Sequence, residues 1–316
     1  MKPPFPWFGG KSRAAALIWR WLGDVENYVE PFAGSLAVML GRPTPPGVET
    51  VNDKDRFVAN FWRAVQHDPE AVAIAADNPV NECDLEARHA WLIQHGATKL
   101  ADTLTDPKGY DAEIAGWWVW GQACWIGSGW CSGEGPWRVE DGTWVRLRNP
   151  GQGVNRQLPH LGDPGRGQRR RAFITEYMRT LADRLRHVRV ACGDWSRVVT
   201  PSITHRFGLT GVVLDPPYGE GEVEYAVGGN RESVAADVRE WAIAEGDNPR
   251  MRIALCGYDG QYEMPESWKV AKWKAAGGYS STAAGDTQGK LNRHRERVWF
   301  SPHCLPVETQ AELIPA

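Results

Sequence analysis

The sequence of 316 residues predicts an α/β fold, in which a mixed, mostly parallel sheet carries helices on both faces and one largely helical insert interrupts the chain. Short apolar runs that end in glycine, proline or acidic residues recur within residues 1–67 and 168–302, and such runs are typical of buried strands. Helical patterns separate these runs, which is the order of βαβ units. The alternation is lost over residues 68–167, so we expect the insert there, and residues 303–316 are expected to form a poorly ordered tail.

The first third of the chain predicts helices and a strand joined by a glycine turn. Ser12 is a candidate N-cap for an apolar helix over residues 14–21. Residues 28–30 predict a strand, and Gly34 then allows a sharp turn into a helix over residues 36–40. Because Gly34 follows the carboxyl end of the strand, the backbone there can approach a bound nucleoside closely.

A second strand over residues 48–53 ends in an acid, Asp53, and precedes a helix over residues 55–66. Asp53 lies about 20 residues after the glycine turn, and this spacing suits an acidic residue that accepts hydrogen bonds from the ribose of a nucleotide. The same pattern is also typical of an ordinary strand, turn and helix. It therefore indicates nucleotide binding only together with the motifs described below.

The predicted insert is rich in aromatic residues and glycine. A helix is expected over residues 87–95, and the tryptophans within residues 116–125 are expected to form a local core. These are Trp117, Trp118, Trp120 and Trp125. Residues 127–168 are too long for a simple connection, and arginines interleaved with aromatic residues suit contact with phosphates and base edges. We therefore expect residues 130–160 to form a contact surface. The arginines of the long stretch are Arg138, Arg146, Arg148, Arg156 and Arg166.

A basic helix is predicted from Arg169 to about His187. Its apolar residues recur at helical spacing and predict the buried face. They are Phe173, Tyr177, Leu181 and Leu185. Its later arginines, Arg179, Arg184 and Arg186, are expected on a solvated face. Phosphate contact by the first turn, which contains Arg169, Arg170 and Arg171, is the second interpretation.

The last third predicts further strands and helices. Residues 191–195 contain the acid Asp194, which is a candidate helix N-cap or turn residue. Glycines over residues 219–232 predict a flexible lid. The remaining predicted elements are a helix over residues 234–245, strands over residues 252–258 and 295–300, and a polar loop that contains Lys290 and Arg293.

The most informative motif is Asp215-Pro216-Pro217-Tyr218, which follows an apolar run over residues 211–214. Two prolines cannot continue a strand, so the run must end there. The sequence thus places a carboxylate, a rigid turn and an aromatic ring at the carboxyl edge of a sheet, where open α/β sheets bind their ligands.

The motif resembles the tetrapeptide that ends the same strand in S-adenosylmethionine-dependent methyltransferases that act on exocyclic amino groups, and its groups suit that reaction. The alternative is a turn that ends a strand and exposes an aspartate. The lone pair of an exocyclic amino nitrogen is shared with the ring, and two acceptors can localise it by drawing the N–H bonds out of the ring plane. The Asp215 carboxylate and the Pro216 carbonyl provide that pair. Pro217 fixes the backbone, and Tyr218 offers a face for a flipped-out base. The expected reaction is one in-line displacement from a sulfonium, assisted by positioning and electrostatics.

In this order, the motifs resemble those of the Dam-type (D12 class) DNA adenine N6-methyltransferases. Those enzymes carry a W-x-G-G-K segment, an F-x-G-x-G turn, an acid after the second strand, a target-recognition insert and a D-P-P-Y motif. The matching residues here are 7–11, 32–34, Asp53 and 215–218. The resemblance extends from about residue 5 to about residue 300, and Leu36 replaces the second glycine of the turn.

The resemblance implies a Rossmann-like fold with a target-recognition insert, S-adenosylmethionine as the cofactor and double-stranded DNA as the substrate. The residues implied in cofactor binding are Trp7, Gly10, Lys11, Phe32, Gly34, Asp53 at the ribose, Asp194 at the adenine amino group, and Asp215. Those implied in DNA binding are Arg138, Arg146, Arg148, Arg156, Arg169, Arg170, Lys290 and Arg293. The resemblance further implies a monomer without a stable protein partner, in the cytoplasm of a bacterium or a phage-infected host cell.

The composition limits the kinds of ligand and the cellular compartment that we expect for the protein. A formal net charge of -3 excludes a globally basic nucleic-acid coat, so any phosphate contacts must be local. The six cysteines form no C-x-x-C pair and no compact cluster with histidine, so no metal is expected, and their scatter fits a reducing cytoplasm. The sequence predicts no membrane span and no secretory signal.

Other functions stay open at this point. The acceptor can be cytosine N4, an adenine in RNA or a protein amide, although related cytosine N4 enzymes usually carry serine in place of Asp215. A catalytically silent DNA-binding protein on the same scaffold is favoured by Leu36 but opposed by the intact Asp215, Pro216 and Tyr218. A cytosine C5 enzyme needs a thiolate nucleophile, typically after proline, and no cysteine here follows one.

Overall fold

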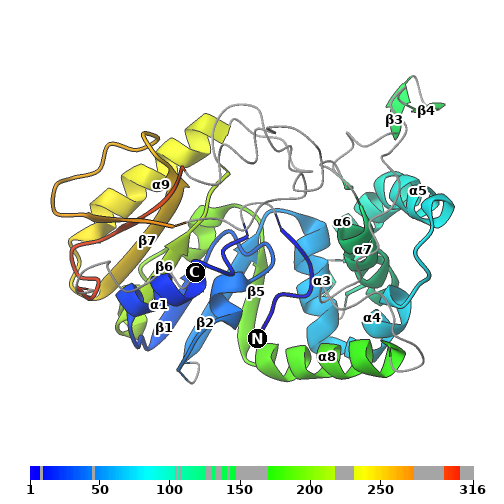
Figure 1. Cartoon of the computed structure of the whole chain (residues 1–316), viewed down its shortest axis with the longest axis horizontal. Coiled ribbons are helices and arrows are strands. Elements are labelled where there is room, and N and C mark those ends of the chain that lie inside the picture. The colour runs from blue at the N-terminus through cyan, green and yellow to red at the C-terminus, as the bar shows by residue number, and fades with distance from the viewer. Residues whose placement is uncertain are drawn as a thin grey trace.

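The computed structural model of the protein describes residues 1–7, 10–44, 47–103, 105–106, 109–125, 130–131, 137–140, 143–146, 170–217, 231–273 and 295–306. For residues 137–140, 143–146, 170 and 231–233 it describes the backbone only. Figure 1 shows a sheet with flanking helices beside a second, mostly helical part.

A seven-stranded sheet forms the centre of the first part. Its strands are β1 (Asn27–Glu30), β2 (Val48–Asp53), β5 (Val188–Cys192), β6 (Thr210–Leu214), β7 (Met251–Tyr258), β8 (Lys269–Lys272) and β9 (Glu296–Phe300). They lie in the order β5-β2-β1-β6-β7-β9-β8. The strands from β5 to β7 in this row are parallel, whereas β9 runs antiparallel to both of its neighbours. The predicted mixed, mostly parallel sheet is therefore confirmed.

The strand order places a topological switch point between β1 and β6. From β1 the chain continues outward through β2 and β5 on one side, whereas β6 is followed by β7 on the other side. The register pairs Asn27 with Thr210 and Val29 with Val212, so the two strands end at the same edge. In open α/β sheets, ligands bind in the crevice outside such a pair of carboxyl ends.

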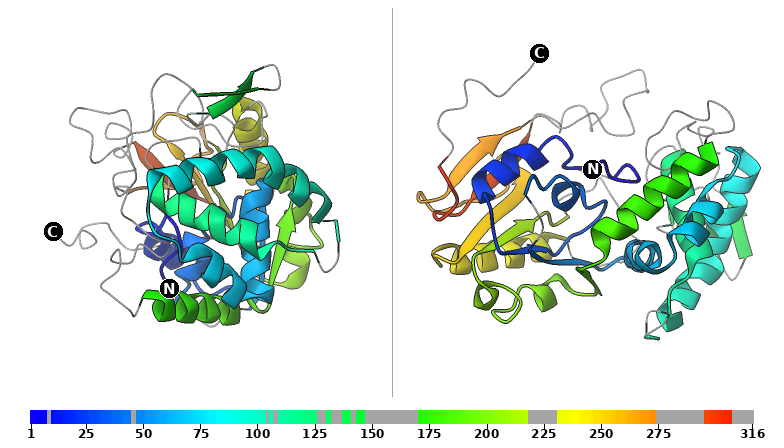
Figure 2. Two further views of the ribbon diagram at one scale, coloured as in Figure 1. Left: turned by 90° about the vertical axis from the view of Figure 1, so that its right-hand side faces the viewer. Right: turned by 90° about the horizontal axis from the view of Figure 1, so that it is seen from below.

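Helices cover both faces of the sheet, as Figure 2 shows from two further directions. The helices around the sheet are α1 (Ala15–Leu22), α2 (Ala37–Leu40), α3 (Arg56–His67), α8 (Arg170–Leu185) and α9 (Arg231–Gly246). Residues of α1 and α3 share one core cluster with Tyr28 and Val213, whereas α9 shares the other with Val29 and Val212. Successive strand residues point to opposite faces, so a strand covered on both sides can be a continuous apolar run, as in β6 over residues 212–214.

The second part consists mainly of helices. These are α4 (Pro69–Ala76), α5 (Glu82–Trp91), the π-helix η1 (Leu92–Gly96), α6 (Ala97–Thr103) and α7 (Ala112–Cys124). As predicted, Trp118, Trp120 and Trp125 are buried, and Trp117 packs partly buried against the same core. The strands β3 (Trp137–Glu140) and β4 (Thr143–Arg146) form an antiparallel hairpin, which Figure 1 shows apart from the large sheet.

Hydrogen bonds join the two ends of the helical part where it leaves the sheet and returns to it. Gln66, near the end of α3, donates from Nε2 to the carbonyl oxygens of Leu185 and Val188, both at 2.8 Å. Leu185 ends α8 and Val188 begins β5. The residues between these hydrogen bonds therefore form a segment whose two ends are tied together.

The buried face of α8 differs from the prediction at its first turn. Tyr177, Leu181 and Leu185 are buried as expected. The prediction that Phe173 is buried is wrong, because this residue is 49% exposed and Ile174 is buried in its place. An α-helix has 3.6 residues per turn, so a strict four-residue spacing drifts off one face after a few turns.

The arginines of α8 make ion pairs. Arg171 Nε lies 3.0 Å from Asp77 at the end of α4. Arg184 donates to both oxygens of the buried Glu49 on β2, at 2.6 and 2.8 Å. The solvated face predicted for Arg184 is therefore wrong, because a carboxylate buried under α8 requires a bidentate cationic partner.

The predicted cap of α1 is also wrong. Residues 11–14 already form a turn, and Ala15 N donates to Lys11 O at 2.8 Å. The helix begins after Ala14, and no side chain caps that position. Ser12 therefore lies two residues too early to act as the N-cap.

The start of the predicted tail is packed against the body of the protein. Cys304 is buried, and Leu305 N donates to Trp21 O at 2.8 Å. Residues 303–306 therefore belong to the packed structure, and residues 307–316 lie outside the described residues. Among the described residues, no helix combines the length and the apolar character that a membrane crossing requires.

Leu36 occupies a backbone conformation that normally favours glycine. Its φ is 55° and its ψ is 30°, which is the left-handed region, and it directly precedes α2. The side chain is fully buried in the core. Leucine therefore makes the turn that a glycine would make and adds buried apolar surface, so the departure from the F-x-G-x-G pattern leaves this turn in place.

We expect Leu36→Gly to destabilise the fold, by about 1–3 kcal/mol, because the lost burial exceeds the relieved strain. Leu36→Ala loses nearly the same burial and keeps the left-handed strain, so it should be the more destabilising by about 1 kcal/mol. Denaturant unfolding of both variants measures the difference. Equal stabilities would show that the conformation at residue 36 carries no strain.

Candidate active site

One buried amide ties together the loops at the carboxyl ends of β1, β2 and β5. Asn52 Nδ2 donates to Pro31 O and to Gly193 O, both at 3.0 Å. In return, Ala33 N donates to Asn52 O at 2.8 Å, and Gly193 N donates to Asp53 O at 3.1 Å. The three loops form one connected edge, and several of the predicted ligand-binding residues lie on it.

The turn after β1 is held from both sides of its backbone. Gly34 has a φ of 44°, its N–H donates to Asp53 Oδ2 at 2.9 Å, and its carbonyl accepts from Trp62 Nε1 at 3.0 Å. The indole of Trp7 packs so closely that a Cβ atom at Gly34 would lie 2.4 Å from Trp7 Nε1. The structure thus brings together three residues predicted from separate motifs, namely Trp7, Gly34 and Asp53.

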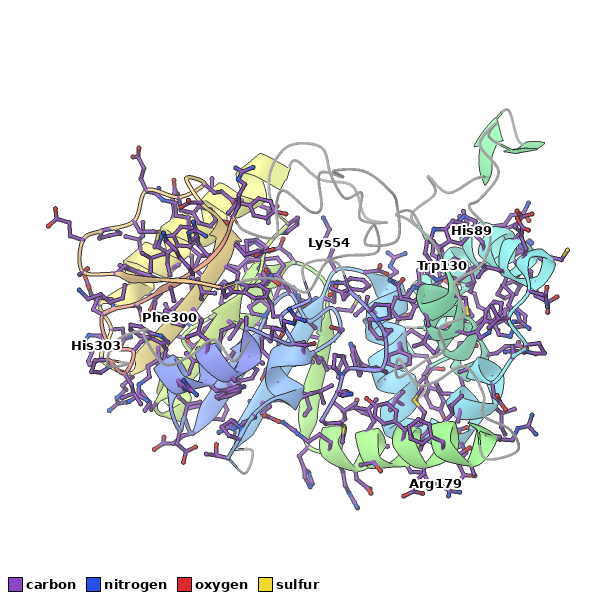
Figure 3. The ribbon with its side chains drawn as sticks, viewed as in Figure 1. Lys54, His89, Trp130, Arg179, Phe300 and His303 are labelled. Atoms are coloured by element: carbon purple, nitrogen blue, oxygen red, sulfur yellow. The ribbon has the colours of Figure 1, made fainter. Side chains whose placement is uncertain are left out.

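Asp53 ends β2 and lies half-buried beside this turn. In addition to Gly34, it accepts from Asp55 N at 2.9 Å through Oδ1. Burial raises the pKa of Asp53 to about 6, and the backbone hydrogen bonds offset this only in part. Each carboxylate oxygen has a second lone pair, so Asp53 can hold the turn and accept from a ligand at once. Figure 3 labels the next residue, Lys54, whose exposed side chain points out from this edge.

An aromatic pair lies at the same edge. The rings of Phe32 and Trp195 are stacked, with centroids 6.3 Å apart and planes 26° apart. Asp194 precedes the short 3-10 helix η4 (Trp195–Val198) and caps it, because Oδ1 accepts from Ser196 N at 3.0 Å. The hydrogen bond from the Ser196 hydroxyl lowers the pKa of Asp194. The capping interpretation of Asp194 is therefore confirmed, while its carboxylate stays exposed to a ligand.

The carboxylate that follows β6 is paired with a buried lysine. Lys11 Nζ lies 2.9 Å from Asp215 Oδ1 and 3.8 Å from Glu296 Oε2. Burial alone would lower the pKa of Lys11, but the charges of Asp215 and Glu296 outweigh it and raise this pKa. Pro216 is buried and Pro217 is half-buried. The resemblance assigned Lys11 to the cofactor pocket, whereas the structure places its ammonium against the predicted catalytic carboxylate.

Two acidic residues near this pair were missed by the sequence reasoning. Glu296 begins β9, about 80 residues beyond Asp215, and nothing in its local sequence points to the site. Glu30 ends β1, is buried, and accepts from Tyr28 Oη at 2.9 Å. Burial raises the pKa of Glu30 to about 8. Glu30 could have been found from one signal in the sequence: it is an acidic residue that ends a strand and precedes a proline.

The remaining predicted residues are not brought to this site by the described structure. Arg138 and Arg146 lie in the hairpin strands β3 and β4, and Arg170 begins α8. The other predicted residues lie outside the described residues, namely Arg148, Arg156, Arg169, Tyr218, Lys290 and Arg293. Within the described residues, no group of three histidine, cysteine or acidic side chains is arranged to hold a metal ion.

We expect Gly34→Ala to lower the stability and to displace Trp7, because the new Cβ would collide with the indole ring. Strain and overpacking together should cost about 2–4 kcal/mol. Gly260→Ala is a matched control, since Gly260 also has a positive φ, of 79°, but has open space around the added Cβ. Thermal unfolding should show only a small loss for the control. Equal losses would mean that the contact with Trp7 is unimportant.

The fold and this edge together define a class of protein. A mostly parallel, Rossmann-like sheet with Asp215 and Pro216 at its switch point is consistent with the fold of a methyltransferase. Residues 7–95 match the family model of the D12 class N6 adenine-specific DNA methyltransferases. The match covers Trp7, Lys11, Gly34 and Asp53, and it confirms the resemblance found in the sequence. A comparison with curated proteins found no match.

Proposed function

We propose that the protein is a site-specific DNA methyltransferase that transfers a methyl group from S-adenosylmethionine to N6 of adenine in double-stranded DNA. The observation that carries this proposal is the placement of Asp215 and Pro216 at the switch point, with the Asp215 carboxylate 2.9 Å from Lys11 Nζ. The family match supports DNA adenine methylation independently.

The residues at the neighbouring strand ends fit an adenosyl cofactor by their chemistry. Gly34 permits close approach of the backbone, and Asp53 offers a carboxylate for ribose hydroxyls. Phe32 and Trp195 offer aromatic faces at the same edge, and the exposed carboxylate of Asp194 can accept from an adenine amino group. When bound, the cofactor supplies a methyl group carried by a sulfonium.

The amino-terminal segment completes the proposed cofactor pocket with Trp7, Gly10 and Lys11. Gly10 N donates to Trp7 O at 3.0 Å, which folds the segment back on itself beside the glycine turn. We propose that Lys11 contributes its backbone to this pocket, because its ammonium group contacts Asp215.

The proposed catalysis rests on two acceptors for the target amino group. The carboxylate of Asp215 and the carbonyl of Pro216 would accept one N–H each and localise the nitrogen lone pair. Pro217 restricts the backbone that carries this carbonyl. Tyr218 would stack on the adenine once the base has flipped out of the duplex. No proton needs to leave the nitrogen before the displacement, and the methylated nitrogen afterwards releases one proton to water. Positioning would therefore supply most of the rate enhancement.

We propose residues 68–167 as the target-recognition insert, between the catalytic segments 1–67 and 168–302, with residues 303–316 as the tail. The hairpin of β3 and β4, which carries arginine in both strands, supports a contact surface at this end of the molecule. The proposed DNA contacts are Arg138, Arg146, Arg148, Arg156, Arg169, Arg170, Lys290 and Arg293. We further propose a monomeric enzyme of the cytoplasm.

The test is methyl transfer from labelled S-adenosylmethionine to unmodified double-stranded DNA, followed by nucleoside analysis. The expected product is N6-methyladenine. Cofactor binding without transfer to DNA would contradict the proposed acceptor and favour RNA or a protein. The absence of both binding and transfer would contradict the enzyme itself and favour a silent DNA-binding protein.

A further inference from the structure

Three charged side chains from distant parts of the chain meet at the end of β6. Lys11 Nζ lies 2.9 Å from Asp215 Oδ1 and 3.8 Å from Glu296 Oε2. The side chains of Lys11 and Glu296 are 4% and 5% exposed, whereas that of Asp215 is 23% exposed. Asp215 is thus the member of the cluster that a ligand can reach, and the other two are shielded from solvent.

The elements that carry these charges indicate how the cluster is held. Glu296 begins β9, where it is paired with Tyr258 of β7, so the sheet fixes its backbone. Lys11 lies in a turn before α1, outside the sheet. At 3.8 Å the carboxylate of Glu296 attracts the ammonium group by charge, whereas at 2.9 Å the ammonium group contacts Oδ1 of Asp215 directly. A carboxylate held at one oxygen has a defined plane, which sets the direction of its second oxygen.

Among the described residues, further acidic groups lie near Asp215. Glu30 of β1 lies close enough for its charge and that of Asp215 to repel each other. Burial raises the pKa of the Cys256 thiol on β7, and the charge of Asp215 raises it further. In such a place, a nearby ammonium favours the ionised carboxylate, whereas a further carboxylate opposes it.

We propose that Lys11 and Glu296 are a pair of positioning residues for Asp215: Glu296 fixes Lys11, and Lys11 orients the carboxylate that accepts from the target amino group. The identity of that amino group rests on the proposed function, whereas the coupling among the three charges is independent of the proposed function.

Kinetics over a wide pH range tests the pair. Lys11→Met should lower kcat about 100-fold while the cofactor Kd changes less than about threefold. The acidic limb of its pH–rate profile should move to higher pH, because the charge cluster loses its cation. Glu296→Gln should lower kcat about tenfold and move the acidic limb to lower pH, because the cluster loses an anion and keeps its cation. Lys11→Arg should recover part of the loss. A purely structural role would not move the two limbs in opposite directions.

The control is Arg179→Met, which removes a cation from an exposed pair, with Arg179 Nη2 2.6 Å from Glu70. Figure 3 shows Arg179 on α8, far from the sheet edge that carries the site. This variant should keep the wild-type value of kcat and the wild-type dependence of kcat on pH. If Lys11→Met raises the cofactor Kd instead of lowering kcat, or if both limbs move in the same direction, the proposal is overturned.

A thermal unfolding cycle tests the coupling without any activity. Lys11→Met should lower the midpoint, because it leaves buried carboxylates without their cation. Asp215→Asn in that background should restore part of the loss, so that the double variant departs from additivity by roughly 3 °C or more. Additive midpoints would overturn the coupling. If the wild-type protein methylates no adenine, the proposed function fails, and the cycle still decides whether the three charges act as a unit.

Discussion

Asp215→Ala is expected to abolish methyl transfer, with a loss of at least about 10³-fold, while cofactor binding survives. The side chain supplies the only carboxylate of the D-P-P-Y motif, and the structure places it at the switch point, partly exposed beside a shielded lysine. Alanine removes the proposed acceptor for the target amino group and leaves Lys11 with less compensation. Only the carbonyl of Pro216 would then stay of the two proposed acceptors.

This result is measured by single-turnover transfer to DNA together with calorimetric titration of the cofactor. Asp215→Asn is the matched variant, because it keeps the shape and one acceptor oxygen but loses the charge. We expect it to retain a small fraction of the rate, above that of Asp215→Ala. Loss of cofactor binding in place of transfer would mean that Asp215 belongs to the cofactor site and that the catalytic assignment is wrong.

Asp53→Ala is expected to weaken cofactor binding by about 10- to 100-fold, which corresponds to roughly 1.4–2.8 kcal/mol. The carboxylate accepts from Gly34 N at 2.9 Å, so its removal loosens the glycine turn as well as the proposed ribose contact. Because burial raises the pKa of Asp53 to about 6, the wild-type affinity should also weaken as the pH falls through that value. Protonation removes the charge that accepts from the hydroxyls, and the variant should lose this dependence.

Asp55→Ala is the control for Asp53. Asp55 lies on the same edge, and its Oδ1 accepts from Phe57 N at 2.8 Å as the N-cap of α3. Its replacement should destabilise the helix by about 1 kcal/mol and change the affinity for the cofactor much less. Titrations of both variants at neutral and acidic pH are decisive. An unchanged affinity in Asp53→Ala would remove the ribose assignment.

The catalytic sheet could be predicted from the sequence because its strands are covered on both faces. Residues 211–214 are apolar throughout and end at two prolines, so both the element and its end were evident. The edge strand β8 was missed for the opposite reason: among its four residues only Ala271 is buried, and two lysines interrupt the pattern. A short strand at the edge of a sheet has one open side and needs no apolar run.

The candidate site could be predicted only where its residues form local motifs. Gly34 and Asp53 were found because a turn and a strand end have recognisable chemistry, and the structure joins them by a hydrogen bond. Glu296 could not be found, because its partner Lys11 lies at the other end of the chain and a salt bridge leaves no trace in either local sequence. The role of Leu36 was equally hidden, since no pattern reveals that leucine takes a left-handed conformation.

The hydrogen bonds from Gln66 to Leu185 and Val188 have a consequence for how such a protein can diversify. They close the segment between α3 and β5 at its base, and Arg184 at the end of the same segment pairs with the buried Glu49 of β2. The sheet therefore needs α8 in place as well as the two ends of the segment. Changing the length of a closed loop alters its closure entropy only slowly. Recombination between related genes, or a laboratory graft, can therefore exchange residues between α3 and α8 while α8, its pair with Glu49 and the seven strands keep their places.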